Sequence, residues 1–189
     1  MRQTLRTLAY LDGLSYVARD IPAGTPLALN DRLSRIGLLS VSGPDQNPPS
    51  YLDSISFHLN GLVQSGGSTQ ALSEEVAAIT AALNNVRVWL QQVRADARQL
   101  AQMSDAQLLQ PAALSLINDM ITAASGAYAG QVDPATGQMR EGAVWIHAQL
   151  QSLATLDITA YTASNSPEQI VPASFRVARV SWIVRGGRT

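Results

Sequence analysis

A strict heptad repeat of apolar residues constrains this chain more than any other feature of its sequence. The spacing alternates between four and three residues through Leu72, Val76, Ile79, Leu83, Val86, Leu90, Val93, Ala97 and Leu100. A period of 3.5 residues predicts one helix, roughly 40 Å long over this stretch, with one face turned toward partner helices. We therefore expect a fold in which helices pack against one another, and we take these residues as candidate interaction residues.

The positions beside the repeat carry few opposite charges. A two-stranded coiled coil usually sets its pairing by charges at the e and g positions. Here the corresponding pairs form no ion pair: Glu75 with Thr80, Ala82 with Arg87, Trp89 with Arg94, and Asp96 with Ala101. The outer f positions are also mostly apolar: Glu74, Ala81, Val88 and Ala95. This pattern favours a bundle over a free two-stranded rod. Two arrangements stay open, a bundle within one chain and a bundle of three or more copies.

Helix boundary signals divide residues 50–155 into further helices. Ser50 with Asp53 predicts the start of a helix that ends near Gly66. Thr69 or Ser73 begins the long helix, which we expect to end near residue 103. A capping box of Ser104 and Gln107 precedes a short turn at 105–110. We then expect a helix over 111–124, and another over 139–154 with Ile146, Leu150 and Leu153 inward. The expected packing face of the 111–124 helix is Leu114, Ile117, Ile121 and Ala124.

The two ends of the sequence predict irregular or extended segments. Residues 1–49 read as an N-terminal arm with a short helix around Leu5 and Leu8, a strand over 14–21, and a Pro-rich linker at 42–49. Residues 156–189 read as a C-terminal extended or β segment, because residues after Phe175 alternate with a period near two. The predicted fold class is therefore mainly α, a helical bundle on one long heptad helix with small β or extended ends, α+β overall.

The C-terminal segment also supplies candidate interaction residues, namely Arg176, Arg179, Trp182 and Arg185. Arginines beside aromatic rings can bind a nucleic-acid backbone by charge and stacking. Arginines on an edge strand equally prevent misplaced pairing or meet acids of a neighbouring subunit. We favour the second interpretation, so nucleic acid is not an expected partner.

Composition excludes several kinds of chemistry. All 13 basic residues are arginine, so Schiff-base lysines and P-loop phosphate binding are excluded. The chain has no cysteine, which excludes disulfide scaffolds and thiol catalysis. His58 and His147 each lack neighbours at metal-ligand spacing, and Asp133 and Glu141 are better explained by a turn and a helix start. We predict no enzyme activity, no cofactor and no metal.

Charged residues make up 14% of the chain, against about 25% in a typical soluble domain, and the net charge is −1. A surface with so little charge does little to keep copies apart. It suits a chain that other subunits cover, and it equally suits a mildly polar monomer from a compositionally biased genome. No apolar run is long enough to span a membrane, and the N-terminus does not read as a signal peptide. We expect a cytoplasmic or virion location.

These features together predict a noncatalytic structural protein of a homo-oligomeric assembly, whose partners are other copies and neighbouring subunits. The low-charge helical middle and the extended ends resemble the general profile of phage virion and tail-assembly proteins. That resemblance implies a virion or tail component. The alternatives are a helical adaptor or regulatory module that binds a partner protein, and an enzyme with an unrecognised carboxylate site.

Overall fold

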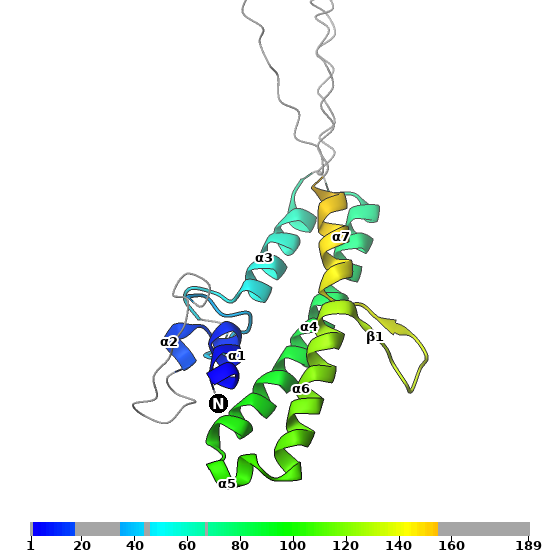
Figure 1. Ribbon diagram of the computed structural model, residues 1–189. Helices are drawn as coiled ribbons and strands as arrows, with labels where there is room; N and C mark the ends of the chain where they lie inside the picture. The colour runs from blue at the N-terminus through cyan, green and yellow to red at the C-terminus, as the bar shows by residue number, and fades with distance from the viewer. Residues whose placement is uncertain (1, 18–34, 44–45, 67, 155–189) are drawn as a thin grey trace, which may run out of the picture.

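The computed structural model describes residues 2–17, 35–43, 46–66 and 68–154, and it is mainly helical (Figure 1). The predicted fold class is confirmed, with one small two-stranded sheet in the described part of the chain. The elements in order are α1 (Arg2–Asp12), α2 (Leu14–Val17), α3 (Tyr51–Gln64), α4 (Gln70–Gln102), α5 (Asp105–Leu108), α6 (Pro111–Ala129), β1 (Gln131–Val132), β2 (Met139–Arg140) and α7 (Ala143–Leu153).

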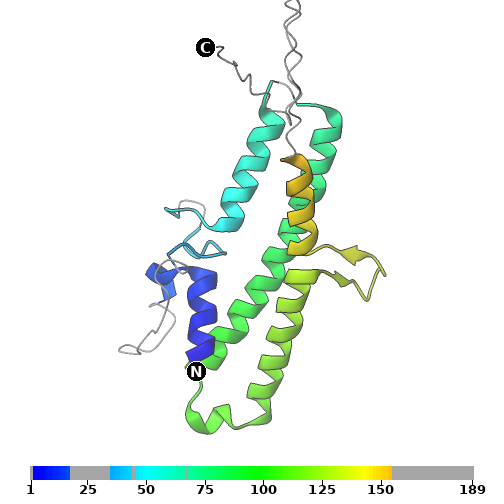
Figure 2. The same ribbon diagram turned by 45° about the horizontal axis from the view of Figure 1, so that its top comes forward.

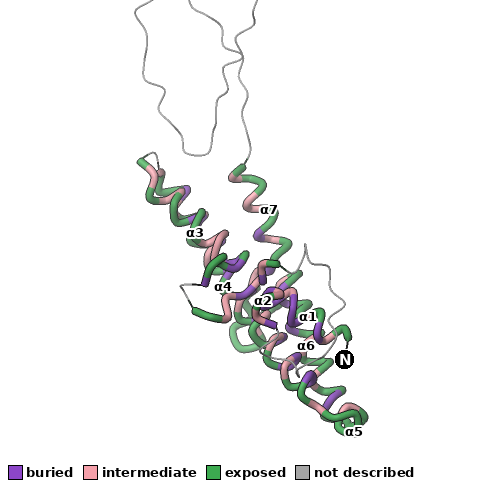
Figure 3. Tube along the Cα trace, turned by 90° about the vertical axis from the view of Figure 1, so that its left-hand side faces the viewer, coloured by how far each residue is buried: buried purple, intermediate pink, exposed green. Residues whose placement is uncertain are grey.

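The long helix α4 is the axis of the fold, and the other helices pack along its sides (Figures 1 and 2). Helices α3 and α7 flank its N-terminal part, whereas α1 and α6 flank its C-terminal part. Buried and exposed positions alternate along the helices, as one-sided packing requires (Figure 3). The described helices therefore form an elongated bundle around α4.

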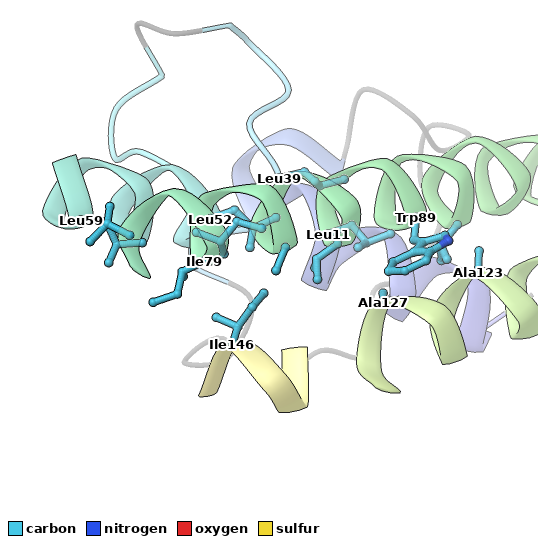
Figure 4. Packing of buried hydrophobic residues seen from close by; sticks show 14 of the residues in the cluster. Leu11, Leu39, Leu52, Leu59, Ile79, Trp89, Ala123, Ala127 and Ile146 are labelled. Atoms are coloured by element: carbon cyan, nitrogen blue, oxygen red, sulfur yellow. The ribbon is translucent and has the colours of Figure 1, made fainter. Parts of the chain in front are cut away.

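The heptad repeat is buried within this bundle. Leu90 alone among its nine members is only partly buried. The others are buried: Leu72, Val76, Ile79, Leu83, Val86, Val93, Ala97 and Leu100. Of the two arrangements that the sequence left open, the structure shows the first for this face, because the chain's own helices cover it. Figure 4 shows part of this core, with side chains of α1, α3, α4, α6 and α7 in one cluster.

The predicted helix starts at residues 50 and 104 are confirmed by side-chain caps, and of the two starts expected for the long helix, Thr69 and Ser73, Thr69 is the cap. The Ser50 Oγ accepts a hydrogen bond from the Asp53 N–H at 3.2 Å, and the Thr69 Oγ1 accepts one from the Leu72 N–H at 3.2 Å. Ser104 and Gln107 form the reciprocal capping box. These signals are local, so they work wherever the helix lies in the fold.

The N-terminal segment differs from the expected arm. The short helix around Leu5 and Leu8 is present as α1, and it packs against α4 with Leu5, Leu8 and Ala9 buried. Residues 14–17 form a helical turn, so the expected strand is wrong there. The helical turn follows from Gly13, whose φ of 86° ends α1. The Gly13 carbonyl then accepts hydrogen bonds from the N–H groups of Tyr16 and Val17. The remainder of that predicted strand, 18–21, lies outside the described residues.

The boundaries between residues 124 and 143 also differ from the prediction. Helix α6 continues to Ala129, five residues beyond the expected end, and Gly130 stops it with a φ of 85°. Residues 139–140 pair with 131–132 in a hairpin, so α7 begins at Ala143 rather than at 139. The predicted turn at Asp133 is confirmed, because its Oδ1 accepts a hydrogen bond from the Ala135 N–H at 2.8 Å. Glu141 consequently precedes α7 and is not in its first turn.

Gly126 allows α6 to approach α4 closely. A Cβ atom at this position would lie 2.9 Å from Cε2 of the Trp89 ring, closer than side chains pack. In Figure 4 the Trp89 ring lies against Ala123 and Ala127 of α6. A glycine with two alanines near it thus accommodates the bulky indole of α4.

We expect Gly126→Ala to destabilise the fold by about 1–3 kcal/mol, because the added methyl must displace the Trp89 ring. The matched control is Gly61→Ala in the exposed part of α3, where a Cβ would meet nothing within 4 Å. That change is expected to stabilise by about 0.5–1 kcal/mol, since alanine favours a helix over glycine. Denaturant unfolding of both variants measures the difference. Equal effects of the two changes would contradict the close-approach role of Gly126.

Candidate interaction surface

Bulky apolar side chains lie along the outside of α6. Leu114, Ile117, Ile121 and Tyr128 are 60%, 43%, 59% and 68% exposed. Together with the exposed Ala124 they follow a three-four-three-four spacing, which places them on one side of the helix. We call Leu114, Ile117, Ile121, Ala124 and Tyr128 the α6 row.

The expected packing face of this helix was therefore wrong. The side of α6 that meets α4 instead carries the residues one position before each member of the α6 row, together with Gly126. Its buried or partly buried members are Ala113, Leu116, Met120, Ala123, Gly126 and Ala127. Where α6 meets the Trp89 ring the reason is steric, because a Cβ atom at Gly126 would lie 2.9 Å from Cε2 of the ring, and Ala123 and Ala127 are the small residues beside it. Leu114, Ile117, Ile121 and Tyr128 are on the outer side.

Uncharged side chains flank the α6 row. Asn118 and Ser125 lie beside it, Ser115 and Thr122 lie further round the helix, and all four are exposed. The hydroxyl of Thr122 donates to the carbonyl of Asn118 at 3.0 Å, so it is already satisfied within the helix. Asp119 is the single charged residue of α6. An apolar row with uncharged flanks suits burial against another protein surface, because no charge has to be desolvated.

Exposed apolar residues also continue beyond both ends of α6. Leu109, just before the helix, is 87% exposed, and Val132 in the hairpin after it is 56% exposed. The hairpin itself projects from the bundle at the C-terminal end of α6 (Figures 1 and 2). Monomeric soluble proteins rarely expose contiguous apolar patches larger than a few hundred Å². The α6 row with these two end residues is therefore the strongest candidate for a contact surface among the described residues.

The residues predicted from sequence fall into two groups. The heptad residues from Leu72 to Leu100 meet in the interior of the bundle, so they serve packing within the chain. The four C-terminal residues Arg176, Arg179, Trp182 and Arg185 lie outside the described residues. Sequence reasoning placed most of the α6 row on the inside and missed Tyr128. The sequence does contain a signal for the observed packing. A second stripe, one position before each member of the α6 row and including Ala113, Ala123 and Ala127, could equally face α4.

The described titratable residues show no arrangement that suggests catalysis. His58 of α3 and His147 of α7 are exposed, and the His58 ring stands edge-on to Phe57 at 5.6 Å. Asp133 is engaged in its turn, and Asp119 is exposed on α6. Within the described ranges, no three His, Cys, Asp or Glu residues are grouped as a metal site. Absence of enzyme activity stays a prediction.

Comparison with known proteins yields no relative: no family model, no curated protein and no solved structure matches this chain. Among the described helices, none has the length and apolar character to cross a membrane.

Proposed function

We propose that this protein is a noncatalytic structural subunit of a homo-oligomeric assembly, in which copies meet through the α6 row. The observation that carries the proposal is the exposure of four large apolar side chains in one row on a helix with a single charge. The main heptad face is already satisfied within the chain, whereas the α6 row is an apolar surface available for contact.

The surface composition supports the same proposal. Only 14% of all residues are charged, and the net charge is −1. Copies of such a chain experience little mutual repulsion when they approach. The resemblance in composition to phage virion and tail-assembly proteins makes a virion or tail the proposed setting. Capsid or tail genes beside the coding gene would support that setting, and an unrelated neighbourhood would oppose it.

The native mass of the full chain at tens of micromolar tests the oligomer directly. Native mass spectrometry or light scattering is expected to give a multiple of the 20.1 kDa chain. A monomer under these conditions would contradict the proposal. A monomer that forms a stable complex only with a different protein would favour the adaptor function instead.

A single charge in the α6 row is expected to dissociate the assembly without unfolding the chain. Ile121→Asp places a carboxylate where the contact would bury it, so we expect association to weaken by more than about 2 kcal/mol, roughly 30-fold in Kd. The control Ser115→Asp adds the same charge on the exposed side away from the row and is expected to leave the native mass unchanged. Circular dichroism verifies that both variants stay folded.

A further inference from the structure

The exposed apolar positions of α6 are arranged symmetrically about Ile121. Leu114 lies seven residues before Ile121 and Tyr128 seven residues after it. Ile117 lies four residues before it and Ala124 three residues after it. Leu109 just before the helix and Val132 in the hairpin just after it are also exposed, one at each end of α6. A two-fold axis through the row at Ile121 therefore brings each exposed apolar position near another one.

We infer that α6 pairs antiparallel with α6 of a second copy, about a two-fold axis near Ile121. The inference rests on the proposed function and specifies its partner surface. In such an isologous contact the same patch serves both copies, so it must be self-complementary. The pattern satisfies this requirement, since Leu114 faces Tyr128 of the second copy and Ile117 faces Ala124 of the second copy.

Charge and size both favour the antiparallel pairing of two copies. The single charge of α6, Asp119, lies outside the α6 row, so identical helices meet without like charges in the contact. A parallel pairing would place Tyr128 against Tyr128 and Ala124 against Ala124. The two tyrosines would then be crowded together, and the two alanines would leave a void between the helices. The antiparallel pairing instead joins a larger residue to a smaller one in these layers.

The hairpin geometry agrees with this orientation. It projects at the C-terminal end of α6, whereas α5 lies at the N-terminal end (Figures 1 and 2). In an antiparallel pair the hairpin of each copy lies beside the start of α6 in the other copy. Val132 of one copy then approaches Leu109 of the other, and these two apolar residues, exposed in the monomer, become covered.

The absence of cysteine makes disulfide cross-linking a clean test in the full chain. A disulfide requires Cα atoms within about 7 Å. Leu114 and Tyr128 in one helix are about 21 Å apart, so they cannot join within a chain. We expect Ile121→Cys to form a covalent dimer and the double variant Leu114→Cys with Tyr128→Cys to do so too. Leu114→Cys alone and Tyr128→Cys alone are expected to stay uncross-linked.

Each other outcome overturns the inference. Efficient cross-linking of Leu114→Cys alone would show a parallel pair. Equal cross-linking of the control Ser115→Cys would show random collision. Failure of every α6 variant to cross-link would place the contact elsewhere, while an oligomeric native mass would leave the proposed function intact. A disulfide within one chain between Ile121→Cys and Trp182→Cys would identify residues 155–189 as the occupant of the row.

Discussion

Replacement of Leu83 by aspartate is expected to abolish cooperative folding. Leu83 is 1% exposed and lies near the middle of α4, where α3, α4 and α7 share one core cluster. Removing a buried leucine side chain alone costs about 2–5 kcal/mol. The aspartate must also bury a charge or take up a proton, which adds several kcal/mol. The total reaches the 5–15 kcal/mol that stabilises a typical domain, so thermal melting by circular dichroism should show no native transition.

Val88→Asp is the matched control for this substitution. Val88 lies five residues further along the same helix and is 54% exposed, so the carboxylate stays in water. We expect its free energy of unfolding to change by no more than about 0.5 kcal/mol. Leu90→Asp should fall between the two, because Leu90 is only partly buried and its replacement can reach solvent. A Leu83→Asp variant that melts with the wild type would refute the packing role of the heptad face.

The parts of the fold that sequence predicted well depend on local chemistry. Ser50, Thr69 and Ser104 cap the helices that they were expected to start, because each hydroxyl bonds to a backbone N–H three residues away. The long heptad helix was equally clear, since an uninterrupted 3.5-residue period predicts one continuous helix. Such signals need no knowledge of what packs against the helix.

The parts that sequence predicted poorly depend on contacts between distant residues. Helix α6 has two adjacent stripes that could face inward, and the contacts with α4, including the Trp89 ring beside Gly126, select one of them. Residues 139–140 leave the expected helix because they pair with 131–132, a choice that local propensity does not encode. The helical turn after Gly13 likewise follows from the left-handed glycine between α1 and α2.

The sequence identified most residues of the candidate surface, but it did not predict that they are exposed. The three-four spacing of Leu114, Ile117, Ile121 and Ala124 was visible, and a stripe of this kind normally marks a buried face. The neighbouring stripe is the inner face, because its Ala123, Gly126 and Ala127 accommodate the Trp89 ring. A heptad stripe therefore predicts a contact, whereas whether that contact lies within the chain or between chains requires the neighbouring side chains.

Arg94→Met is expected to destabilise the protein by about 3–5 kcal/mol, although methionine preserves most of the side-chain volume. The Nε of Arg94 in α4 lies 2.7 Å from Oδ1 of Asp12 in α1. The Asp12 side chain is 0% exposed, whereas that of Arg94 is 21% exposed. The substitution thus removes a cation from a fully buried carboxylate at the junction of the two helices. Denaturant unfolding measures the loss.

Arg87→Met provides the comparison that separates burial from ion pairing as such. Its guanidinium lies 2.9 Å from the carboxylate of Asp53 in α3, with the two side chains 27% and 37% exposed. Water screens this pair, so we expect its loss to cost only about 0.2–1 kcal/mol. The double variant Asp12→Leu with Arg94→Met should recover much of the stability lost in Arg94→Met, because it removes the buried charge together with Arg94. If the double variant is no more stable than Arg94→Met, the buried charge is not the cause of the loss.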